Sequence, residues 1–347
     1  MSEFFKAVKS CDPNTESMTV TVIDGEHIGE KAVITGGSFS YLSEKDGFIK
    51  KHEQEITAVS DSGVREIDGI KVYLEYVGHE KKLVICGCGH VSLPIIKLGK
   101  MLGFSVTAID DRPEFAGNAG DAGADIVITE NFKDALQRIE SDLFTYYVIV
   151  TRGHHWDEEC LRVICSKPHA YIGMMGSKRR VSVVKENLVK EGIDKDVMDN
   201  VHSPIGLSIG SETPEEIAVS ILAEIIEIKN AKKDFTVPGD ILKAVNGSAH
   251  EEAEPGRKIL ATIIRKEGSA PREAGTKMLI LRDKAINTIG GGLLESRIIT
   301  KAREMLSKDD PGPELMHLTL SADAASQEGE VCGGNLDVFI EEIKQDE

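Results

Sequence analysis

Apolar and polar positions alternate in different ways along this chain, and the changes of pattern divide it into segments. Residues 1–78 contain short β-branched stretches near 18–23, 31–35 and 70–77, separated by glycine turns, which predicts a small β-rich segment. From residue 79 to 230, short apolar runs alternate with helical patterns. This alternation predicts a parallel sheet that is covered by helices on both faces.

The predicted strands of this sheet are 83–86, 105–109, 125–129, 146–151 and 169–173. Its last helix has a defined start, because Thr213 is a suitable N-cap, Pro214 occupies the first helical position and Glu216 completes a capping box. Residues 231–256 are polar, contain proline and glycine, and are predicted to be a linker. The expected fold is therefore α/β: a Rossmann-like domain at 79–230, flanked by the β-rich segment and a glycine-rich α+β module at 257–347.

A faint internal repeat connects the two ends of the chain. MTVTVIDGEHIGEKAVITGG parallels ILATIIRKEGSAPREAGTKM, and GIKVYLEYV parallels GGNLDVFIEEI. We interpret residues 1–78 as a degenerate copy of the C-terminal module that acts as scaffold. Its histidines, His27, His52 and His79, lie in polar surroundings and are expected to be solvated.

Composition narrows the functional classes. A formal net charge of −17 over 347 residues argues against binding to nucleic acid or to an anionic membrane, since both need a basic surface. Six scattered cysteines do not form a disulfide framework, and the first residues lack the apolar core of a signal peptide. We expect a cytoplasmic protein with reduced thiols and no membrane segment.

The stretch KLVICGCGHVSLPIIKLGKMLGFSVTAIDDR, residues 82–112, has the strand, turn, helix and strand of a dinucleotide-binding unit. Gly87 permits the tight turn, and Gly89 lets backbone amides approach a pyrophosphate at the helix N-terminus. Asp110, about 20 residues further on, is placed to accept hydrogen bonds from ribose hydroxyls. His90 lies in the same turn.

Further candidate residues follow other predicted strands, at the sheet edge where such folds bind ligands. Arg152 and His154 belong to one loop, and a second loop runs into a basic helix start. Consecutive cations at a helix N-terminus oppose the helix dipole unless an anion binds there, so we predict a phosphate-bearing ligand. The residues assigned to this second loop are Gly176, Ser177, Arg179 and Arg180. Adjacent histidines rarely ligate one ion, and we predict no metal site at 154–155.

Three glycine-rich clusters in the C-terminal module also indicate a ligand, because glycines at a strand-to-helix junction expose amides. Cys332, which precedes two glycines, is the thiol with the best claim to chemistry. The residues assigned to this part of the site are Ser269, Arg272, Gly290, Gly291, Gly292, Glu295 and Gly333.

The motifs GCGHVS, AIDDRPEF, VTRGHHWD, YIGMMGSKRR, GSAPREAG, GGGLLES and CGGNLDVFIEE resemble those of the xanthine dehydrogenase accessory protein family (XdhC/CoxI-like). The resemblance implies a cofactor-binding accessory protein, more a chaperone than a catalyst. Such a protein binds the sulfurated molybdenum cofactor, as molybdopterin or its dinucleotide form, and assists its insertion into a molybdenum hydroxylase such as xanthine dehydrogenase. A cysteine desulfurase and a second copy of the chain are expected partners.

On this interpretation, the phosphate end of the cofactor binds the Rossmann-like domain and the pterin or metal end binds the C-terminal module. Cys332 would contact molybdenum or carry sulfur. Here the C-terminal module follows the Rossmann-like domain, whereas in many relatives it precedes it. Two alternatives stay open. One is an NAD(P)-dependent oxidoreductase with His154 or His155 as proton donor, and the other is an adaptor without a small-molecule site.

Overall fold

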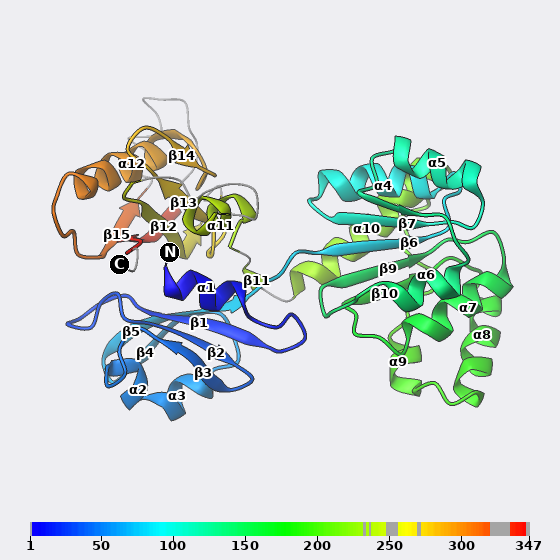
Figure 1. Cartoon of the computed structure of the whole chain (residues 1–347), viewed down its shortest axis with the longest axis horizontal. Coiled ribbons are helices and arrows are strands. Elements are labelled where there is room, and N and C mark those ends of the chain that lie inside the picture. The colour runs from blue at the N-terminus through cyan, green and yellow to red at the C-terminus, as the bar shows by residue number, and fades with distance from the viewer. Residues whose placement is uncertain are drawn as a thin grey trace. The chain divides into compact units, whose positions relative to one another are not determined.

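The computed structural model describes residues 2–231, 234–235, 237–247, 256–268, 272–319 and 334–344. The chain forms two compact units (Figure 1). Unit 1 combines residues 1–78 with 233–347, and unit 2 is residues 79–232. The segment predicted as a Rossmann-like domain is therefore inserted between the two parts of unit 1.

Unit 2 contains a five-stranded parallel sheet. In chain order its strands are β6 (Lys82–Cys86), β7 (Ser105–Ile109), β8 (Ile126–Ile128), β9 (Thr145–Ile149) and β10 (Tyr171–Met174). In space they lie in the order β10-β9-β6-β7-β8. The chain thus changes direction across the sheet between β6 and β9, and doubly wound sheets bind ligands at such a switch point.

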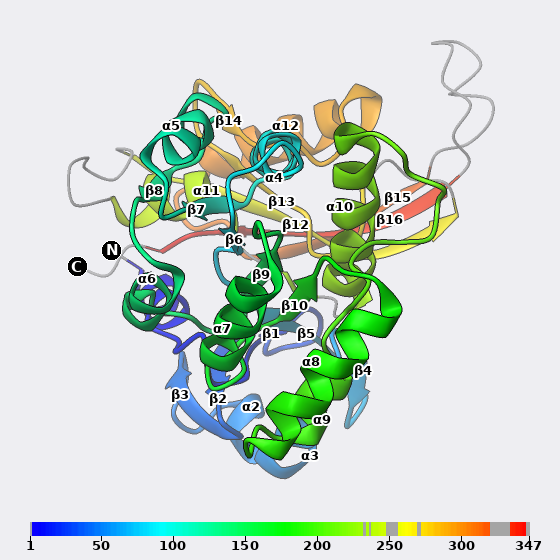
Figure 2. The same ribbon diagram turned by 90° about the vertical axis from the view of Figure 1, so that its right-hand side faces the viewer.

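Helices cover both faces of this sheet (Figure 2). One face packs on α4 (Ser92–Met101), α5 (Pro113–Asp121) and α10 (Pro214–Ala231), and the other packs mainly on α6 (Phe132–Arg138), α7 (His154–Ile164), α8 (Lys178–Lys190) and α9 (Lys195–Asp199). The predicted capping box forms at the start of α10, where the Glu216 amide donates to Thr213 Oγ1 at 3.2 Å and the Thr213 amide donates to Glu216. The predicted α/β class with a Rossmann-like parallel sheet is confirmed. None of the described helices has the length and apolar character needed to span a bilayer.

Unit 1 contains two antiparallel sheets. Module 1 is the first sheet, with β1 (Ser17–Val22), β2 (Lys31–Thr35), β3 (Ser38–Leu42), β4 (Gly63–Ile67) and β5 (Ile70–Val77). Module 2 is the second, with β12 (Ile259–Gly268), β13 (Lys277–Ile280), β14 (Ala285–Ile286), β15 (Glu314–Thr319) and β16 (Gly334–Glu342). The strand order is β3-β2-β1-β5-β4 in module 1 and β14-β13-β12-β16-β15 in module 2, so the two orders match strand for strand. Their common origin stays a prediction.

Each module has one face covered by its own helices. The short helices α2 (Phe48–Lys51) and α3 (Glu53–Thr57) pack on module 1, and α12 (Gly292–Leu306) packs on module 2. Helix α1 (Glu3–Lys9) packs against α11 (Gly239–Asn246) and, with it, on the opposite face of module 2. Segment 231–256, predicted as a linker, therefore contains a helix with buried residues, and it also contains β11 (Asp234–Phe235), which pairs with β5.

Two ion pairs with little exposure lie where the two modules meet. Lys277 of module 2 donates to Glu75 of module 1, and Lys31 of module 1 donates to Glu341 of module 2 at 2.8 Å. Each strand register places these residues at equivalent positions, because Thr21 is opposite Lys31 as Thr262 is opposite Lys277. The two ion pairs are thus reciprocal, and each module supplies one lysine and one glutamate.

Two histidines do not follow the expectation that they are solvated. His52 is stacked on Phe48 with 4.2 Å between ring centroids, and only 18% of its side chain is exposed. His27 approaches the same phenylalanine at 5.9 Å. The polar residues next to these histidines in the sequence led to the expectation of solvation. In the structure both histidines instead lie against the apolar ring of Phe48.

Candidate functional site

The glycine turn after β6 is held tightly on one side and open on the other. Gly87 has φ +101°, and a Cβ atom there would lie 2.6 Å from the Val150 carbonyl oxygen, so only glycine fits between the ends of β6 and β9. The Ser92 hydroxyl donates to the Gly87 carbonyl at 2.5 Å. A Cβ on Gly89, by contrast, would meet no atom within 4 Å. The turn therefore leaves room for a ligand to approach the backbone at Gly89, beside the start of α4.

Asp110 is fully buried at the end of β7, and its carboxylate contacts the protein itself. It accepts hydrogen bonds from the Cys88 amide at 2.8 Å and from Arg112 Nε and Nη2 at 2.8 and 2.9 Å. Burial opposes ionisation, but the Arg112 and Cys88 hydrogen bonds outweigh it and hold the pKa of Asp110 below its ordinary value. Asp110 thus fixes the glycine turn, and the predicted contact with a ribose would have to compete with these bonds.

Arg152, after β9, pairs with Asp111 through two hydrogen bonds, one of them 2.8 Å long. Its guanidinium also lies over the ring of Trp156, 4.6 Å from the centroid. The hydrogen bonds from Arg152 lower the pKa of Asp111. His154, the first residue of α7, is exposed, as is His90 in the glycine turn. The ends of β6, β7 and β9 thus carry six of the ten site residues predicted in unit 2: Gly87, Gly89, His90, Asp110, Arg152 and His154.

Hydrogen bonds of Thr151 and Asp157 fix the loop that carries Arg152. The Thr151 hydroxyl donates to the Asp157 carboxylate at 2.5 Å and is itself an acceptor for the Gly153 amide at 3.3 Å. Burial raises the pKa of Asp157 to about 6, despite the hydrogen bond from Thr151. Asp157 therefore positions the start of α7, a role that no local pattern around it indicates.

The basic helix start lies after β10, next to β9 in the sheet. Ser177 is the exposed N-cap of α8, and its side chain does not cap the helix amides. Arg179 is exposed, and Gly176 is half-buried. The side chains of Lys178 and Arg180 lie outside the described part of the structure. An exposed cation beside amides that the N-cap side chain leaves free would suit an anion, and the predicted phosphate contact stays a prediction.

Cys88 is a buried core residue. Its side chain is 1% exposed, and burial, with Asp110 nearby, raises the pKa of its thiol to about 12. The nucleophile and the metal ligand in cysteine chemistry is the thiolate. Cys88 is therefore a neutral thiol at physiological pH and packs in the core beneath α4.

A second group of predicted residues belongs to unit 1. Gly290, Gly291 and Gly292 all have positive φ, at 133°, 75° and 65°, and lead into α12. The Glu295 carboxylate accepts hydrogen bonds from the Gly291 amide at 3.0 Å and the Ile289 amide at 3.2 Å, and also from Thr288. Burial opposes ionisation of Glu295, but these bonds outweigh it and lower its pKa. Glu295 thus holds the glycine loop in shape. Arg272 is exposed, and Ser269, Cys332 and Gly333 lie outside the described residues.

One polar network of unit 2, between α10, β10 and the loop that follows α9, was not predicted. Glu224 of α10 accepts a hydrogen bond from the Tyr171 hydroxyl at 2.6 Å and from the Gly206 amide at 3.0 Å, and it pairs with His202 at 3.3 Å. Burial opposes ionisation of Glu224, but the bonds from His202 and Tyr171 keep its pKa below the ordinary value. The network fixes the 202–210 loop. A glutamate within the apolar stripe of a helix was the available signal for it.

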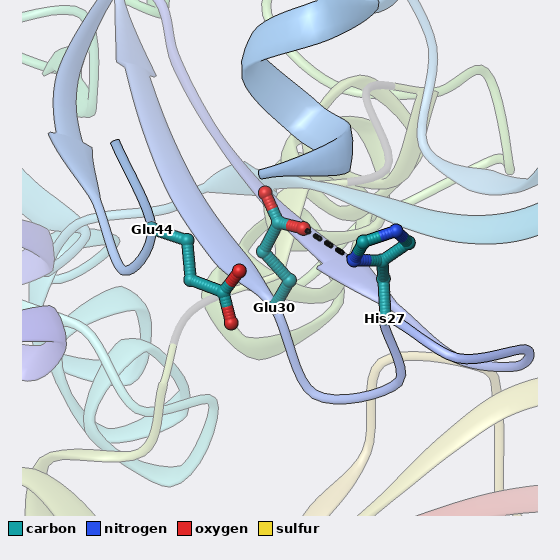
Figure 3. Close-up of side chains that lie close together, drawn as sticks. All are labelled: His27, Glu30 and Glu44. Carbon is teal, nitrogen blue, oxygen red and sulfur yellow. Dashed lines mark ion pairs between the residues drawn. The ribbon is translucent and has the colours of Figure 1, made fainter. Parts of the chain in front are cut away.

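One cluster in unit 1 has the residue types of a metal site. The ligand atoms of His27, Glu30 and Glu44 all lie within 4.8 Å of one another, and Figure 3 shows His27 facing the Glu30 carboxylate. Both oxygens of Glu30 already accept backbone amides at the start of α2, from Phe48 at 2.8 Å and Ile49 at 2.9 Å. Helix capping explains the buried carboxylate, so we assign no metal to this cluster.

Comparisons with known proteins agree with this architecture. Residues 83–225 match the model of the XdhC Rossmann domain, and residues 252–319 match the model of the XdhC and CoxI family. The chain belongs to the XdhC and CoxI family. Both matches fall on segments that carry predicted site residues, one in each unit.

Individual relatives cover only part of the chain. It is 31% identical over 160 residues to a probable xanthine dehydrogenase subunit of Bacillus subtilis, covering 46% of each protein. It is 29% identical over 184 residues to the uncharacterized protein YqeB of Escherichia coli, covering 52% of this chain and 33% of that protein. The chain thus spans between a third and a half of the length of these relatives. A crystal structure of a xanthine dehydrogenase from Bacillus halodurans shares the fold, with a TM-score of 0.52 and 24% identity over 69% of this chain and 68% of that one.

Proposed function

We propose that this protein binds the molybdenum cofactor, as molybdopterin or its dinucleotide form, and assists its insertion into a molybdenum hydroxylase such as xanthine dehydrogenase. Membership in the XdhC and CoxI family supports a role in the maturation of xanthine dehydrogenase-type enzymes. The residues of this chain would hold the cofactor, and its redox-active molybdenum would work in the client enzyme. The client enzyme, a cysteine desulfurase and a second copy of the chain are the partners that this role requires or favours.

The observation that carries the proposal is the glycine turn of unit 2. Gly89 faces open space at the switch point of the sheet, while Gly87, Ser92 and Asp110 hold the turn around it. Backbone amides at a helix N-terminus bind phosphate, the anionic group of both forms of the cofactor. Because the net charge of the chain is −17, an anion can bind only where the local potential is positive. The backbone amides of the turn and exposed Arg179 supply positive charge of this kind.

NAD(P) is the alternative ligand for the same turn, and an oxidoreductase the alternative function. The Rossmann-like order of the sheet supports it. Against it, both oxygens of Asp110 are engaged by Cys88 and Arg112, so this acid has no free oxygen directed to a ribose. A phosphate contact with the amides of the turn needs no oxygen of Asp110. The turn therefore fits a ligand held by its phosphate better than a dinucleotide recognised through its ribose.

The proposal is tested by loading purified protein anaerobically with isolated molybdenum cofactor and measuring bound molybdenum by mass spectrometry. Gly89→Val fills the open space beside the turn, and we expect at least a tenfold loss of binding. Gly117→Val in α5 is the matched control, because a Cβ at Gly117 also meets no atom within 4 Å. Wild-type binding that survives Gly89→Val, or tight NADH binding with turnover and no uptake of molybdenum, contradicts the proposal.

A further inference from the structure

A buried tyrosine lies where the two modules of unit 1 meet, and its hydroxyl lacks a protein partner. Tyr73 of β5 is 4% exposed, and its hydroxyl oxygen has no hydrogen-bond partner among the described residues. Burial, with the Glu75 carboxylate nearby, raises the pKa of Tyr73, so the hydroxyl keeps its proton. Buried hydroxyls almost always bond to protein or to ordered water, so this one indicates a partner other than the described side chains.

This hydroxyl belongs to one module only. Thr21 is opposite Tyr73 in module 1 as Thr262 is opposite Phe339 in module 2, so Tyr73 and Phe339 occupy equivalent positions. Both rings pack in the same hydrophobic cluster. Because a phenylalanine is sufficient for the packing in module 2, packing alone does not require the oxygen atom of Tyr73.

A small cavity lies beside the two rings. Its volume is about 30 Å³, and Tyr73 and Phe339 both line it. The residues of the two inter-module ion pairs line it as well: Lys31, Glu341, Lys277 and Glu75. A water molecule needs about 10–15 Å³ of such space and two to four polar partners, whereas small-molecule sites measure about 300–1,000 Å³. The cavity therefore has room for one or two waters.

The ion pairs leave hydrogen-bonding capacity at this cavity. Lys277 donates to Oε1 of Glu75 and Lys31 donates to Oε1 of Glu341, so neither bond uses the Oε2 atom of the carboxylate. Lys31 also donates to Thr21 at 3.1 Å, and Lys277 also donates to a backbone carbonyl. Each ammonium has three N–H donors, so one remains on each lysine. The cavity thus offers both donors and acceptors, which a water molecule can satisfy at the same time.

We propose that one or two ordered water molecules bind in this cavity, and that one of them is hydrogen-bonded to the Tyr73 hydroxyl and to the charged ends of the ion pairs. The two lysines and two glutamates cancel in charge. An ion transferred into this neutral, buried space would lose more hydration free energy than a water molecule does, so the occupant is a neutral polar molecule. The site stabilises the contact between the modules and does not depend on the ligand of the proposed function.

The test is a crystal structure of the full chain at a resolution that shows ordered water. We expect a water within about 3.2 Å of the Tyr73 hydroxyl oxygen. Tyr73→Phe removes this oxygen and keeps the ring, as Phe339 does at the equivalent position, and the water beside it should be lost. Tyr76→Phe on the same strand is the matched control. The Tyr76 hydroxyl donates to the Ser60 carbonyl and does not line the cavity, so the water should stay.

Urea unfolding, followed by far-UV circular dichroism, adds a measurement in solution. Loss of a water-mediated hydrogen bond lowers stability, whereas removal of a hydroxyl without a partner leaves stability unchanged or raises it. We therefore expect Tyr73→Phe to lower the urea midpoint of the unit 1 transition. A midpoint equal to that of wild type, or above it, overturns the proposal.

The wild-type structure decides by itself if Tyr73→Phe fails to fold. A Tyr73 hydroxyl that bonds directly to the Glu75 carboxylate, with no water beside it, contradicts the proposed site. A water that keeps its position in Tyr73→Phe contradicts it too, because the hydroxyl would then not hold the water.

Discussion

The buried ion pair between Lys277 and Glu75 allows a quantitative prediction. Both side chains are less than a tenth exposed, at 6% and 8%, and Lys277 also donates to the Gly275 carbonyl at 3.2 Å. Lys277→Met keeps a long unbranched side chain but leaves the Glu75 carboxylate buried without its cation. Breaking one side of a buried pair in this way costs about 3–5 kcal/mol of unfolding free energy.

Protonation of Glu75 limits that cost. Burial raises the pKa of Glu75, Lys277 opposes this, and the ordinary value is 4.5. In the variant Glu75 lacks its cation, so its pKa rises further than in wild type and it is protonated over a wider pH range. Protonation relieves part of the cost of about 3–5 kcal/mol, so the loss is smaller at pH 5 than at pH 7, and it changes by at most about 1.4 kcal/mol for each pH unit. The sign is fixed: the variant loses stability relative to wild type as pH rises.

The assay uses the position of the single tryptophan. Trp156 belongs to unit 2, so its fluorescence follows that unit, whereas far-UV circular dichroism follows both units. Urea unfolding at pH 5, 6 and 7 should show the unit 1 transition shifting while the tryptophan transition stays in place. Lys277→Met with Glu75→Gln should lose the pH dependence, and Lys50→Met, which removes an exposed pair, should cost less than about 1 kcal/mol. A pH-independent loss in Lys277→Met would refute the reasoning.

Three further predictions concern unit 2 and are read from Trp156 fluorescence. Gly87→Ala should destabilise unit 2 by about 3 kcal/mol in urea, because it combines a positive φ with a clash on the Val150 carbonyl; an unchanged midpoint contradicts this. Burial raises the pKa of Asp157, so the wild type loses stability as pH rises from about 4 to about 6. Asp157→Asn lacks this titration and should gain up to about 3 kcal/mol of unfolding free energy relative to wild type over that range. Parallel pH profiles of the two proteins contradict this. Arg152→Gln should change the emission of Trp156 by removing the overlying guanidinium, while the midpoint moves by less than about 1 kcal/mol; an unchanged spectrum contradicts this.

The parallel sheet could be predicted because its signal is local. Buried strands appear as short apolar runs, and the glycine turn and the Thr213 capping box each depend on neighbouring residues only. The residues of the glycine turn could be named for the same reason. The hydrogen-bond partners of Asp110 could not be predicted. The spacing of the motif brings an acid to the turn, but it does not tell whether the carboxylate binds a ligand or Arg112.

The packing of the two modules in unit 1 could not be predicted from the sequence, for a different reason. Thr19 and Thr21 alternate with apolar residues, a pattern typical of a strand with one face in water. In the structure this face is buried, because Lys31 and Lys277 are neutralised by glutamates that lie far away in the sequence. Hydrophobic patterning treats each charged residue as solvated, and only the three-dimensional partner reveals the exception.

The reciprocal ion pairs also indicate where ligand contacts of unit 1 should be sought. Each module contributes one lysine and one glutamate to the shared face, so this face is occupied by the pairing of the modules themselves. Features that serve the pairing occur in both modules, whereas features that serve a ligand need to occur only once. Residues 265–268 of β12 pair with residues 334–337 of β16, and the Gly290–Gly292 loop has three glycines with positive φ; neither feature has a counterpart in the described part of module 1. We therefore propose that module 1 is a scaffold and that the ligand contacts of unit 1 belong to module 2.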